Sequence, residues 1–439
     1  MENRFKVPVL GNCTVKSPLS LSHVEGDGIF DYLTDEDRVL HDASLKEFKK
    51  CLNEGIEPLS FEKAGPREYL YFEPAKTKVG IVTCGGLCPG LNNVIRSLVM
   101  HLYYRYSVKK VLGFQYGYEG LAPEFNHPYI ELTPQYVQQI HLYGGTILGT
   151  SRGNQDVKEM VCTLERHNIN ILFTIGGDGT LRGAQSLKEE IERRGLKIAV
   201  GGIPKTIDND INLIERSFGF ETAFSMANDV IRYAHNEAIG ANNGIALIKL
   251  MGRDSGFIAA NAALAIQEVN FVLVPEMRFD LHGEKGFINV LRKRLENRKH
   301  ALIVVAEGAG QDLIEEDDVQ KDASGNILHQ DIGLFLKEKI KSEFKKIDFK
   351  FTLKYIDPSY IIRSAPANPN DSKFCSLLAQ NAVHAAMAGR TGFVVGNWNN
   401  DFTILPIISA VEGRKVIDLE SDLWWNVLEA TGQPSMVND

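Results

Sequence analysis

The stretch that decides the fold is Val79-Gly-Ile-Val-Thr-Cys-Gly-Gly-Leu-Cys-Pro-Gly90. A short β-branched run at 79–83 leads into a glycine-rich turn, and apolar residues then recur with a period near 3.6 over 91–104. This order of strand, tight turn and helix is the repeating unit of parallel α/β sheets. The sequence therefore predicts an α/β fold from about residue 78 onward.

The same unit recurs along the chain. A strand at 169–175 precedes Gly176-Gly-Asp-Gly-Thr180, and a helix then runs to about Arg194. Further strands are expected near 197–200, 244–250, 271–274, 301–306 and 392–395, with helices at 221–239, 255–266, 371–388 and 421–430. The polar, acidic stretch between Gly310 and Asn326 is expected to be an exposed loop. Repeated units of this kind predict largely parallel sheets with helices on both faces.

Composition excludes several classes of protein. The chain has 439 residues, a formal net charge of -8 and 44% hydrophobic residues. A typical domain of roughly 150 residues suggests two or three domains. An acidic balance disfavours nucleic acid or a membrane as the main partner, and no apolar run approaches the roughly 20 residues that span a bilayer. Six cysteines without CxxC spacing and an N-terminus without a secretory pattern favour a cytoplasmic chain with reduced thiols.

Three glycine-bearing turns, each expected at the carboxyl end of a strand, suggest a phosphate-binding region. They are Gly85-Gly86 with Gly90, Gly144-Gly145 through Arg152-Gly153, and Gly176 to Thr180. Ligands of open α/β sheets gather at the carboxyl ends of strands, where backbone N–H groups attract anions. One such turn can simply join a strand to a helix, but three favour a nucleotide or polyphosphate. The chain lacks GxxxxGK[ST], so it is not a Walker P-loop protein.

Asp178 lies among the glycines of the third turn. A carboxylate there would repel phosphate unless a hard divalent cation lay between them, so Asp178 is a magnesium candidate. The alternative interpretation is a helix N-cap.

The segment Pro204-Lys-Thr-Ile-Asp-Asn-Asp210 carries two carboxylates that flank an asparagine. One of them could act as a base, although Asp-Asn-Asp is equally compatible with ordinary turn chemistry. Lys205 and Thr206 add a cation and a hydroxyl, which suits the junction of a phosphate and an alcohol. Further polar groups follow other strands and could bind a sugar phosphate, or else be solvated surface: Met251-Gly-Arg253, Ala306-Glu-Gly308, Lys354 and Tyr360-Ile-Ile-Arg363.

Together these motifs resemble those of the 6-phosphofructokinases, and more closely the long ATP-dependent group that includes plant and trypanosome enzymes. The resemblance covers about Lys76 to Ile408. The motifs are Cys84-Gly-Gly-Leu-Cys-Pro-Gly-Leu-Asn-Asn93, Gly149-Thr-Ser-Arg-Gly153, Gly176-Gly-Asp-Gly-Thr180, Pro204-Lys-Thr-Ile-Asp-Asn-Asp210, Lys249-Leu-Met-Gly-Arg-Asp-Ser-Gly-Phe-Ile258, Val274-Pro-Glu276, Ala306-Glu-Gly308 and Asp357-Pro-Ser-Tyr-Ile-Ile-Arg363. Lipid kinases and NAD kinases resemble only the Gly-Gly-Asp-Gly-Thr turn.

The resemblance implies roles for particular residues in transfer of the γ-phosphoryl of MgATP to the 1-hydroxyl of fructose 6-phosphate. Asp208 is similar to the catalytic base of the family, and the catalytic group also includes Thr206, Asp210 and Arg253. Residues similar to the nucleotide phosphate site are Gly85, Gly86, Arg152, Gly153, Gly177, Asp178, Gly179 and Thr180, with magnesium near Asp178. Residues similar to the fructose 6-phosphate site are Thr206, Ile207, Asp208, Asp210, Met251, Gly252, Arg253, Glu307, Lys354, Tyr360 and Arg363.

Two residues bear on the phosphoryl donor. Pyrophosphate-using relatives carry Asp at the position of Gly179, where a carboxylate would crowd and repel the α-phosphate of ATP. Lys205 favours pyrophosphate, because pyrophosphate users also carry Lys at this position, whereas short bacterial ATP enzymes carry Gly. The long ATP group combines both residues, so ATP is expected.

The resemblance also implies an organisation. Two Rossmann-like lobes are expected: a nucleotide-binding lobe of residues 76–220 with 364–408, and a fructose 6-phosphate-binding lobe of residues 221–363 with 409–439. Residues 1–75 are expected to form an N-terminal extension, and a homodimer or homotetramer is expected. Short bacterial enzymes carry an interface Arg where this chain has Gly244, so that contact must be absent or replaced.

Two rival functions stay open. One is a pyrophosphate-dependent phosphofructokinase. The other is a non-catalytic regulatory subunit that binds sugar phosphate, although such a subunit would be expected to have lost Asp208 or Asp178.

Overall fold

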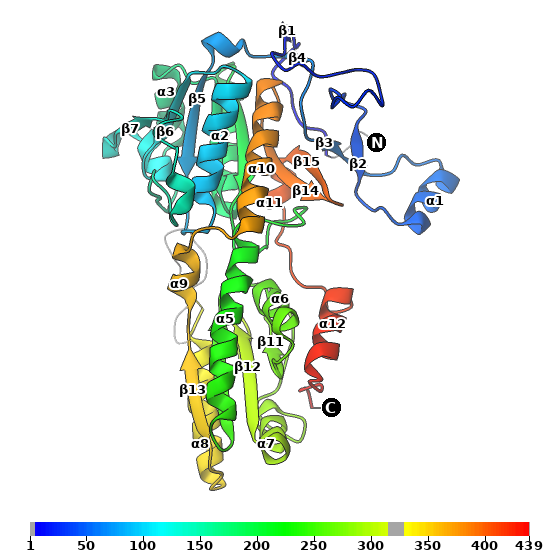
Figure 1. Cartoon of the computed structure of the whole chain (residues 1–439), viewed down its shortest axis with the longest axis vertical. Helices are drawn as coiled ribbons and strands as arrows, with labels where there is room; N and C mark the ends of the chain where they lie inside the picture. The colour runs from blue at the N-terminus through cyan, green and yellow to red at the C-terminus, as the bar shows by residue number, and fades with distance from the viewer. Residues whose placement is uncertain (1–4, 315–328, 439) are drawn as a thin grey trace. The chain divides into compact units, whose positions relative to one another are not determined.

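The computed structural model describes residues 5–314 and 329–438. The chain divides into two compact units (Figure 1). Unit 1 consists of Met1–Thr206, Ile211–Gly219 and Ser364–Arg414, and unit 2 of Ile207–Asp210, Phe220–Arg363 and Lys415–Asp439. The short segment Ile207–Asp210 therefore belongs to unit 2, although the chain on either side of it belongs to unit 1.

Unit 1 is built on a mixed sheet. Within the described residues its strand order is β2-β3-β15-β14-β9-β8-β5-β6-β7. The five central strands are parallel, namely β14 (Phe393–Trp398), β9 (Ala199–Pro204), β8 (Ile171–Gly176), β5 (Lys78–Thr83) and β6 (Lys110–Phe114). The antiparallel strands are β2 (Arg38–Leu40), β3 (Ser60–Lys63), β15 (Asp401–Pro406) and β7 (Tyr129–Glu131). Every residue of β8 and β9 is buried, as expected for strands covered on both faces.

Helices cover both faces of this sheet. On one face α2 (Leu91–Arg105) packs against α10 (Pro369–Met387), and the two lie side by side in Figure 1. α4 (Asp178–Arg193) also packs on β8 and β9, but together with α3 (Val157–Arg166) and α11 (Ile407–Val411). The contacts therefore place helices in two separate layers.

The N-terminal segment of the described chain is joined to the sheet of unit 1. Its strand β3 pairs with β15, and β2 pairs with β3. Its β1 (Val15–Lys16) pairs with β4 (Tyr69–Leu70), and helix α1 (Leu45–Glu54) has no buried residue. Residues before 76 thus extend a sheet whose centre comes from much later in the chain.

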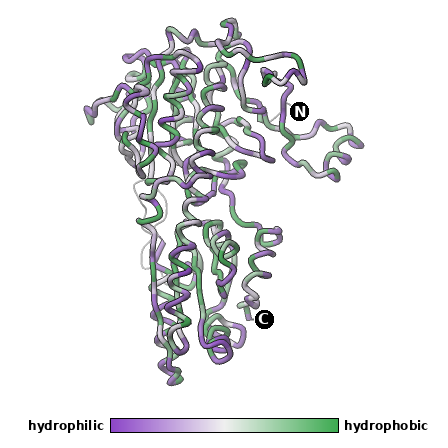
Figure 2. The backbone as a smooth tube through the Cα atoms, in the orientation of Figure 1, coloured by the Kyte–Doolittle hydropathy of each residue, from purple (hydrophilic) through white to green (hydrophobic). Residues whose placement is uncertain are grey.

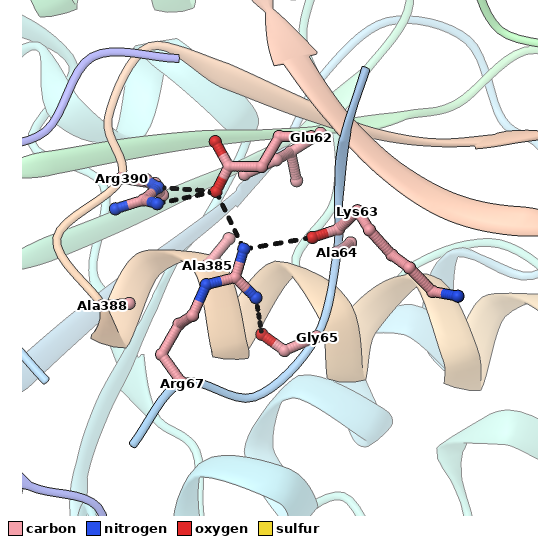
Figure 3. A pocket seen from close by; sticks show the side chains of 9 residues that line it. Glu62, Lys63, Ala64, Gly65, Arg67, Ala385, Ala388 and Arg390 are labelled. Atoms are coloured by element: carbon pink, nitrogen blue, oxygen red, sulfur yellow. Dashed lines mark hydrogen bonds and ion pairs between the residues drawn. The ribbon is translucent and has the colours of Figure 1, made fainter. Parts of the chain in front are cut away.

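A buried ion-pair network fastens this segment. Glu62 on β3 has a side chain only 7% exposed, and its Oε1 accepts hydrogen bonds from Arg67 at 3.0 Å and from Nε of Arg390 at 2.8 Å (Figure 3). Arg390 also pairs with Asp35. The folded protein is strongly destabilised when one partner of a buried ion pair is lost. Glu62 therefore ties the N-terminal segment to the chain after α10.

Unit 2 contains a smaller, fully parallel sheet. Within the described part of the chain its order is β11 (Phe271–Leu273), β12 (His300–Ala306), β10 (Gly244–Leu250) and β13 (Thr352–Ile356). α5 (Phe220–Ile239) and α6 (Phe257–Ile266) pack on each other and on the sheet, and α12 (Asp422–Thr431) packs on α6 and β11. α7 (Phe287–Arg298), α8 (Ile332–Lys346) and the sheet share a separate apolar core. Figure 2 shows β12 as hydrophobic and α7 as mostly hydrophilic, in keeping with a buried strand and a helix on the surface.

The predicted α/β class with largely parallel sheets is confirmed. The strand at 244–250 matches β10, whereas the strand expected near 197–200 is β9 at Ala199–Pro204. The sequence interpretation missed α3, α7, α8 and β13, which are short or highly charged. Most of the predicted acidic loop lies outside the described residues, and its first residues form a short 3₁₀ helix, Gln311–Leu313. Among the described helices we find none with the length and apolar character to span a membrane.

Candidate active site

Three adjacent strands of unit 1 end beside the turns that the sequence predicts to bind phosphate. β5, β8 and β9 are parallel neighbours, so their carboxyl ends lie at one edge of the sheet. Backbone hydrogen bonds continue past the strands, from Cys84 N to Ile175 O at 3.0 Å and from Lys205 N to Gly176 O at 2.9 Å. The first and third glycine turns and the start of the Lys205 loop are therefore brought together.

The second glycine turn reaches the same place by another route. It follows a 3₁₀ helix, Ile140–Leu142, and not a strand, so the expectation that it lies at a strand end was wrong. Gly85 N donates to Ser151 O at 3.0 Å, and Thr83 Oγ1 donates to Gly149 O at 2.7 Å. These contacts bring the segment with Arg152 and Gly153 beside the first turn.

Lys205 contacts the first turn directly. Its Nζ donates to the carbonyl oxygen of Gly86 at 2.8 Å, and the residue is buried. Gly85 adopts φ = 83°, a left-handed conformation that favours glycine. The structure thus places a buried cation against a glycine turn predicted to bind phosphate.

Asp178 is the first residue of α4, and the N-cap of that helix is Gly177. The N-cap interpretation of Asp178 was therefore wrong. Its Oδ2 accepts a hydrogen bond from Nε of Arg182 at 3.0 Å. Among the described residues no group of three or more His, Cys, Asp or Glu side chains could hold a metal. Mg²⁺ is commonly held by one or two carboxylates, substrate phosphates and water, so a single carboxylate at a helix N-terminus fits that ion.

Gly179 stands beside open space. A Cβ added there would meet no atom within 4 Å, whereas one added to Gly176 would lie 2.1 Å from Oγ1 of Thr180. Thr180 is further held by the hydroxyl of Tyr118, which donates to its carbonyl oxygen at 2.7 Å. Gly176 is therefore required by packing, whereas Gly179 is not.

Unit 2 gathers the predicted base and its neighbours. Asp208 is buried, and Oγ of Ser255 donates to its backbone carbonyl oxygen at 3.0 Å. The backbone N–H of Arg253 donates to Oε1 of Glu307 at 2.8 Å, and Glu307 N bonds to Leu250 O. The ends of β10 and β12 and the segment Ile207–Asp210 thus meet in one cluster.

The turn after β10 has a demanding backbone geometry. Arg253 has φ = 50°, and a Cβ on Gly252 would lie 2.3 Å from the carbonyl oxygen of Ser255. Gly308 lies so close that an added Cβ would sit 2.1 Å from Arg253 O. These glycines allow the turn to close around the arginine, beside the buried Met251.

The electrostatics of this cluster act on Asp208. Burial, followed by the charges of Asp210 and Glu307, raises the pKa of the Asp208 carboxyl to about 7, and Arg253 and Arg363 oppose the shift. A carboxyl group with a pKa near the working pH is well suited to accept a proton from an alcohol.

Three residues predicted for the fructose 6-phosphate site are not part of this cluster. Lys354 is inside β13, opposite Ala246, four residues before the end of β10, and its side chain lies 4.0 Å from Glu237. At about 3.3 Å per residue, that is roughly 13 Å from the strand end. Tyr360 lies on the short helix α9 (Ser359–Ser364) and is 86% exposed. Thr206 belongs to unit 1, where its carbonyl oxygen accepts a hydrogen bond from Ser217.

The backbone at Gly244 leaves no room for a side chain. A Cβ added there would lie 2.0 Å from the carbonyl oxygen of Ala238. This backbone cannot accept the longer side chain found at the corresponding position in short bacterial enzymes without a shift in α5 or β10.

Ser255 is a residue that the sequence interpretation left without a role. Its contact with Asp208 links positions 47 residues apart. The only available signal was its place in the Met251 to Gly256 motif, and a single sequence does not say which residue its hydroxyl meets.

Comparison with known proteins decides the family. The model of the family described as phosphofructokinase matches residues 78–386, well over half of the chain. The chain belongs to the phosphofructokinase family. Among its relatives, ATP-dependent 6-phosphofructokinase of Borreliella burgdorferi is 49% identical, with 99% of this chain and 98% of that protein aligned. That of Trypanosoma cruzi is 48% identical over 90% of this chain and 81% of its own, and ATP-dependent 6-phosphofructokinase 7 of Arabidopsis thaliana is 47% identical with the same coverage.

Solved structures of phosphofructokinases share the fold of this family member. The pyrophosphate-dependent enzyme of Marinobacter aquaeolei matches with a TM-score of 0.64 at 17% identity, over 82% of this chain and 92% of that one. Phosphofructokinase of Saccharomyces cerevisiae matches with a TM-score of 0.61 at 21% identity, over 81% of this chain and 48% of that one. The resemblance seen in the motifs, including that to plant and trypanosome enzymes, is confirmed.

Proposed function

We propose that this chain is an ATP-dependent 6-phosphofructokinase, which transfers the γ-phosphoryl of MgATP to the 1-hydroxyl of fructose 6-phosphate in glycolysis. The observation that carries the proposal is the buried Asp208 carboxyl, whose pKa is raised to about 7 among Asp210, Glu307, Arg253 and Arg363. Relatives 45 to 49% identical over most of the chain, named ATP-dependent 6-phosphofructokinases, support the same activity.

Asp208 acts as the base in this proposal. Its carboxylate takes the proton of the 1-hydroxyl, and because phosphoryl transfer has a loose transition state, the proton leaves late. Arg253 and Arg363 stabilise the negative charge that develops on the transferred group and hold the sugar phosphate. Met251, Gly252 and Glu307 shape the rest of the acceptor site, and Thr206, Ile207 and Asp210 flank the base.

The turns of unit 1 bind the donor in this proposal. Backbone N–H groups around Gly85, Gly86, Gly153 and Gly177 to Thr180 suit phosphate oxygens, and Arg152 adds a cation. Asp178 would hold the magnesium ion, which supplies positive charge to the β- and γ-phosphates when it is bound. Arg182 keeps the Asp178 carboxylate paired before the ion arrives.

ATP is favoured over pyrophosphate because of Gly179. The space beside this glycine is open, so an aspartate would fit the protein and place its charge where a donor binds. A second candidate, pyrophosphate-dependent activity, is favoured by one observation: Lys205 lies against the Gly85-Gly86 turn, where a compact polyphosphate could use its charge. A non-catalytic regulatory subunit is disfavoured because Asp208 and Asp178 are both present.

We further propose a cytoplasmic homodimer or homotetramer under allosteric control. Lys354 is a proposed 6-phosphate ligand and Tyr360 a proposed sugar contact. Both are exposed in the isolated chain, which suits ligands that act in an assembly.

A donor comparison tests the proposal. The purified chain should form fructose 1,6-bisphosphate from fructose 6-phosphate with MgATP and much less with pyrophosphate. Asp208→Ala or Asp208→Ser should lower kcat by about 10³-fold or more. Asp229→Asn is a matched control, since it removes an exposed carboxylate of the same unit that pairs only with the exposed Arg232 among the contacts described for it. Turnover with pyrophosphate alone would support the second candidate, and no turnover with either donor would support the regulatory subunit.

A further inference from the structure

Lys249 is a partly buried cation at the end of β10 that has no assigned role in the reaction. Its side chain is 13% exposed, and its Nζ lies 2.7 Å from Oδ2 of Asp331 and 2.9 Å from Oδ2 of Asp357. Burial disfavours its charged form, but the hydrogen bonds to the two carboxylates raise the pKa of Lys249 overall. The pKa values of both carboxyl groups are lowered, so the cluster is charged at neutral pH.

The ion pair between Lys249 and Asp357 lies just beyond the last backbone pairing of β10 with β13. β10 and β13 pair in register from Gly244 with Thr352 to Ile248 with Ile356. Lys249 and Asp357 are the next residues on the two strands, so their side chains continue the pairing one step beyond the last backbone partners. Beyond this point one segment continues to Arg253 and the other to Arg363.

Asp357 also fixes the start of α9. While Oδ2 contacts Lys249, Oδ1 accepts hydrogen bonds from the backbone N–H of Ser359, at 3.1 Å, and from its hydroxyl. α9 has only six residues and buries only Ile362, so it is too short to be stable by itself. Its position therefore depends on the contacts at its first turn, and Arg363 lies near its end.

We propose that Lys249 and Asp357 are positioning residues that hold Arg253 and Arg363 at the spacing required by fructose 6-phosphate. The inference rests on the proposed function and deepens it, because neither residue needs to touch the substrate. Lys249 precedes Arg253 by four residues, and Asp357 precedes Arg363 by six. Both arginines act electrostatically on Asp208, so a shift of either segment changes the surroundings of the base.

Asp331 provides a matched control. It contacts the same ammonium group through Oδ2, but its Oδ1 accepts from the backbone N–H of Leu334 and from the hydroxyl of Tyr355, at the start of α8. Asp331→Asn and Asp357→Asn therefore each remove one negative charge beside Lys249 with almost no change in volume. Only Asp357→Asn disturbs the link to α9.

The test measures kcat, KM for fructose 6-phosphate, KM for ATP and the melting temperature of full-length variants. Asp357→Asn should raise KM for fructose 6-phosphate by about tenfold or more, because small displacements of substrate-positioning groups have large effects on binding and rate. KM for ATP should change by less than about twofold, and Asp331→Asn should change KM for the sugar phosphate by less than about twofold at a similar loss of melting temperature.

A double-mutant cycle separates positioning from general stability. Lys249→Met should resemble Asp357→Asn, and the Lys249→Met/Asp357→Asn double variant should be no worse than either single one, since both remove the same link. Calorimetric titration with fructose 6-phosphate should show the same loss in affinity without turnover.

Two results would overturn the inference. One is an unchanged KM for fructose 6-phosphate in folded Asp357→Asn, and the other is an equal rise in Asp331→Asn. If Lys249→Met does not fold, the two Asn variants alone decide the matter. A wild-type chain that does not phosphorylate fructose 6-phosphate would refute the proposed function, while the calorimetric comparison of the two Asn variants would still report on positioning.

Discussion

The hydroxyl of Ser255 donates a hydrogen bond to the backbone carbonyl oxygen of Asp208 at 3.0 Å. Ser255 ends the turn that contains Arg253, and its hydroxyl also lies 3.0 Å from Gly252 O. The backbone of the proposed base is therefore fixed to the turn that carries its strongest opposing charge. Changes of charge around Asp208 should consequently appear in its titration more than in its position.

Asp208→Asn should abolish turnover and also change stability with pH. The folded-state pKa of about 7 lies above the ordinary value of 3.8, so the wild-type carboxyl favours folding fully only below about pH 4 and loses that contribution as the pH rises to 7. An amide does not ionise. The variant should therefore match wild type only below about pH 4, and its stability advantage should grow with pH to about 2 to 4 kcal/mol at pH 8.

Denaturant or thermal unfolding at pH 5 and pH 8 checks this expectation. Asp229→Asn serves as the control, because its carboxylate is exposed and its stability should follow that of wild type at both pH values. A variant that is less stable than wild type at pH 8 would contradict a raised pKa at Asp208.

Glu307→Gln and Arg363→Gln should shift the acid limb of the pH–rate profile in opposite directions. The charge of Glu307 raises the pKa of Asp208 and that of Arg363 lowers it. Removing the first should move the acid limb to lower pH, and removing the second should move it to higher pH. The measurement is kcat/KM for fructose 6-phosphate from pH 5.5 to 9. The phosphate of the substrate titrates identically for each variant, so shifts in the same direction would refute the electrostatic assignment.

Gly179→Asp should fold normally and lose ATP-dependent activity. Because a Cβ at this position meets nothing within 4 Å, the melting temperature should change little. The new carboxylate should repel the α-phosphate of ATP and raise KM for ATP by about tenfold or more, with a smaller effect on pyrophosphate. Gly179→Asn has nearly the same volume without the charge and separates crowding from repulsion. Unchanged ATP kinetics in Gly179→Asp would refute Gly179 as a determinant of the donor.

Glu62→Gln should destabilise unit 1 without a direct effect on chemistry. It leaves the buried Arg67 and Arg390 with less compensating charge and should lower the free energy of unfolding by about 3 kcal/mol. Thermal unfolding measures the loss, and KM values at a temperature where the variant is folded should be those of wild type. Asp35→Asn removes a more exposed partner of the same arginines and should have a smaller effect.

The sequence predicted the central strands well because their signal is local. The runs that became β5, β8 and β10 are short, mostly buried apolar segments followed by glycine-containing turns, and these features lie next to one another in the chain. α7 and α8 escaped prediction because they are rich in Lys, Arg and Glu, and their buried residues are spaced among charges. β13 was missed because it is an edge strand with no fully buried residue, so its pattern lacks the apolar continuity of the others.

The candidate site was predictable as a set of motifs but not as an arrangement. The residues of the glycine turns and of Asp208, Arg253 and Glu307 could be named from the order of short motifs. The contact of Lys205 with Gly86 spans 119 positions and the ion pair of Lys249 with Asp357 spans more than 100, and neither is visible in local spacing.

By itself the sequence determined the fold class, the family and the chemical groups available for catalysis, because these depend on residue type and short-range order. Only the tertiary structure decided that the N-terminal strands complete the large sheet, that Gly244 leaves no room for a side chain, and that Asp208 is buried among two carboxylates and two arginines. Burial and charge proximity are properties of the packed chain, and they change a carboxyl pKa by several units while the residue itself stays the same.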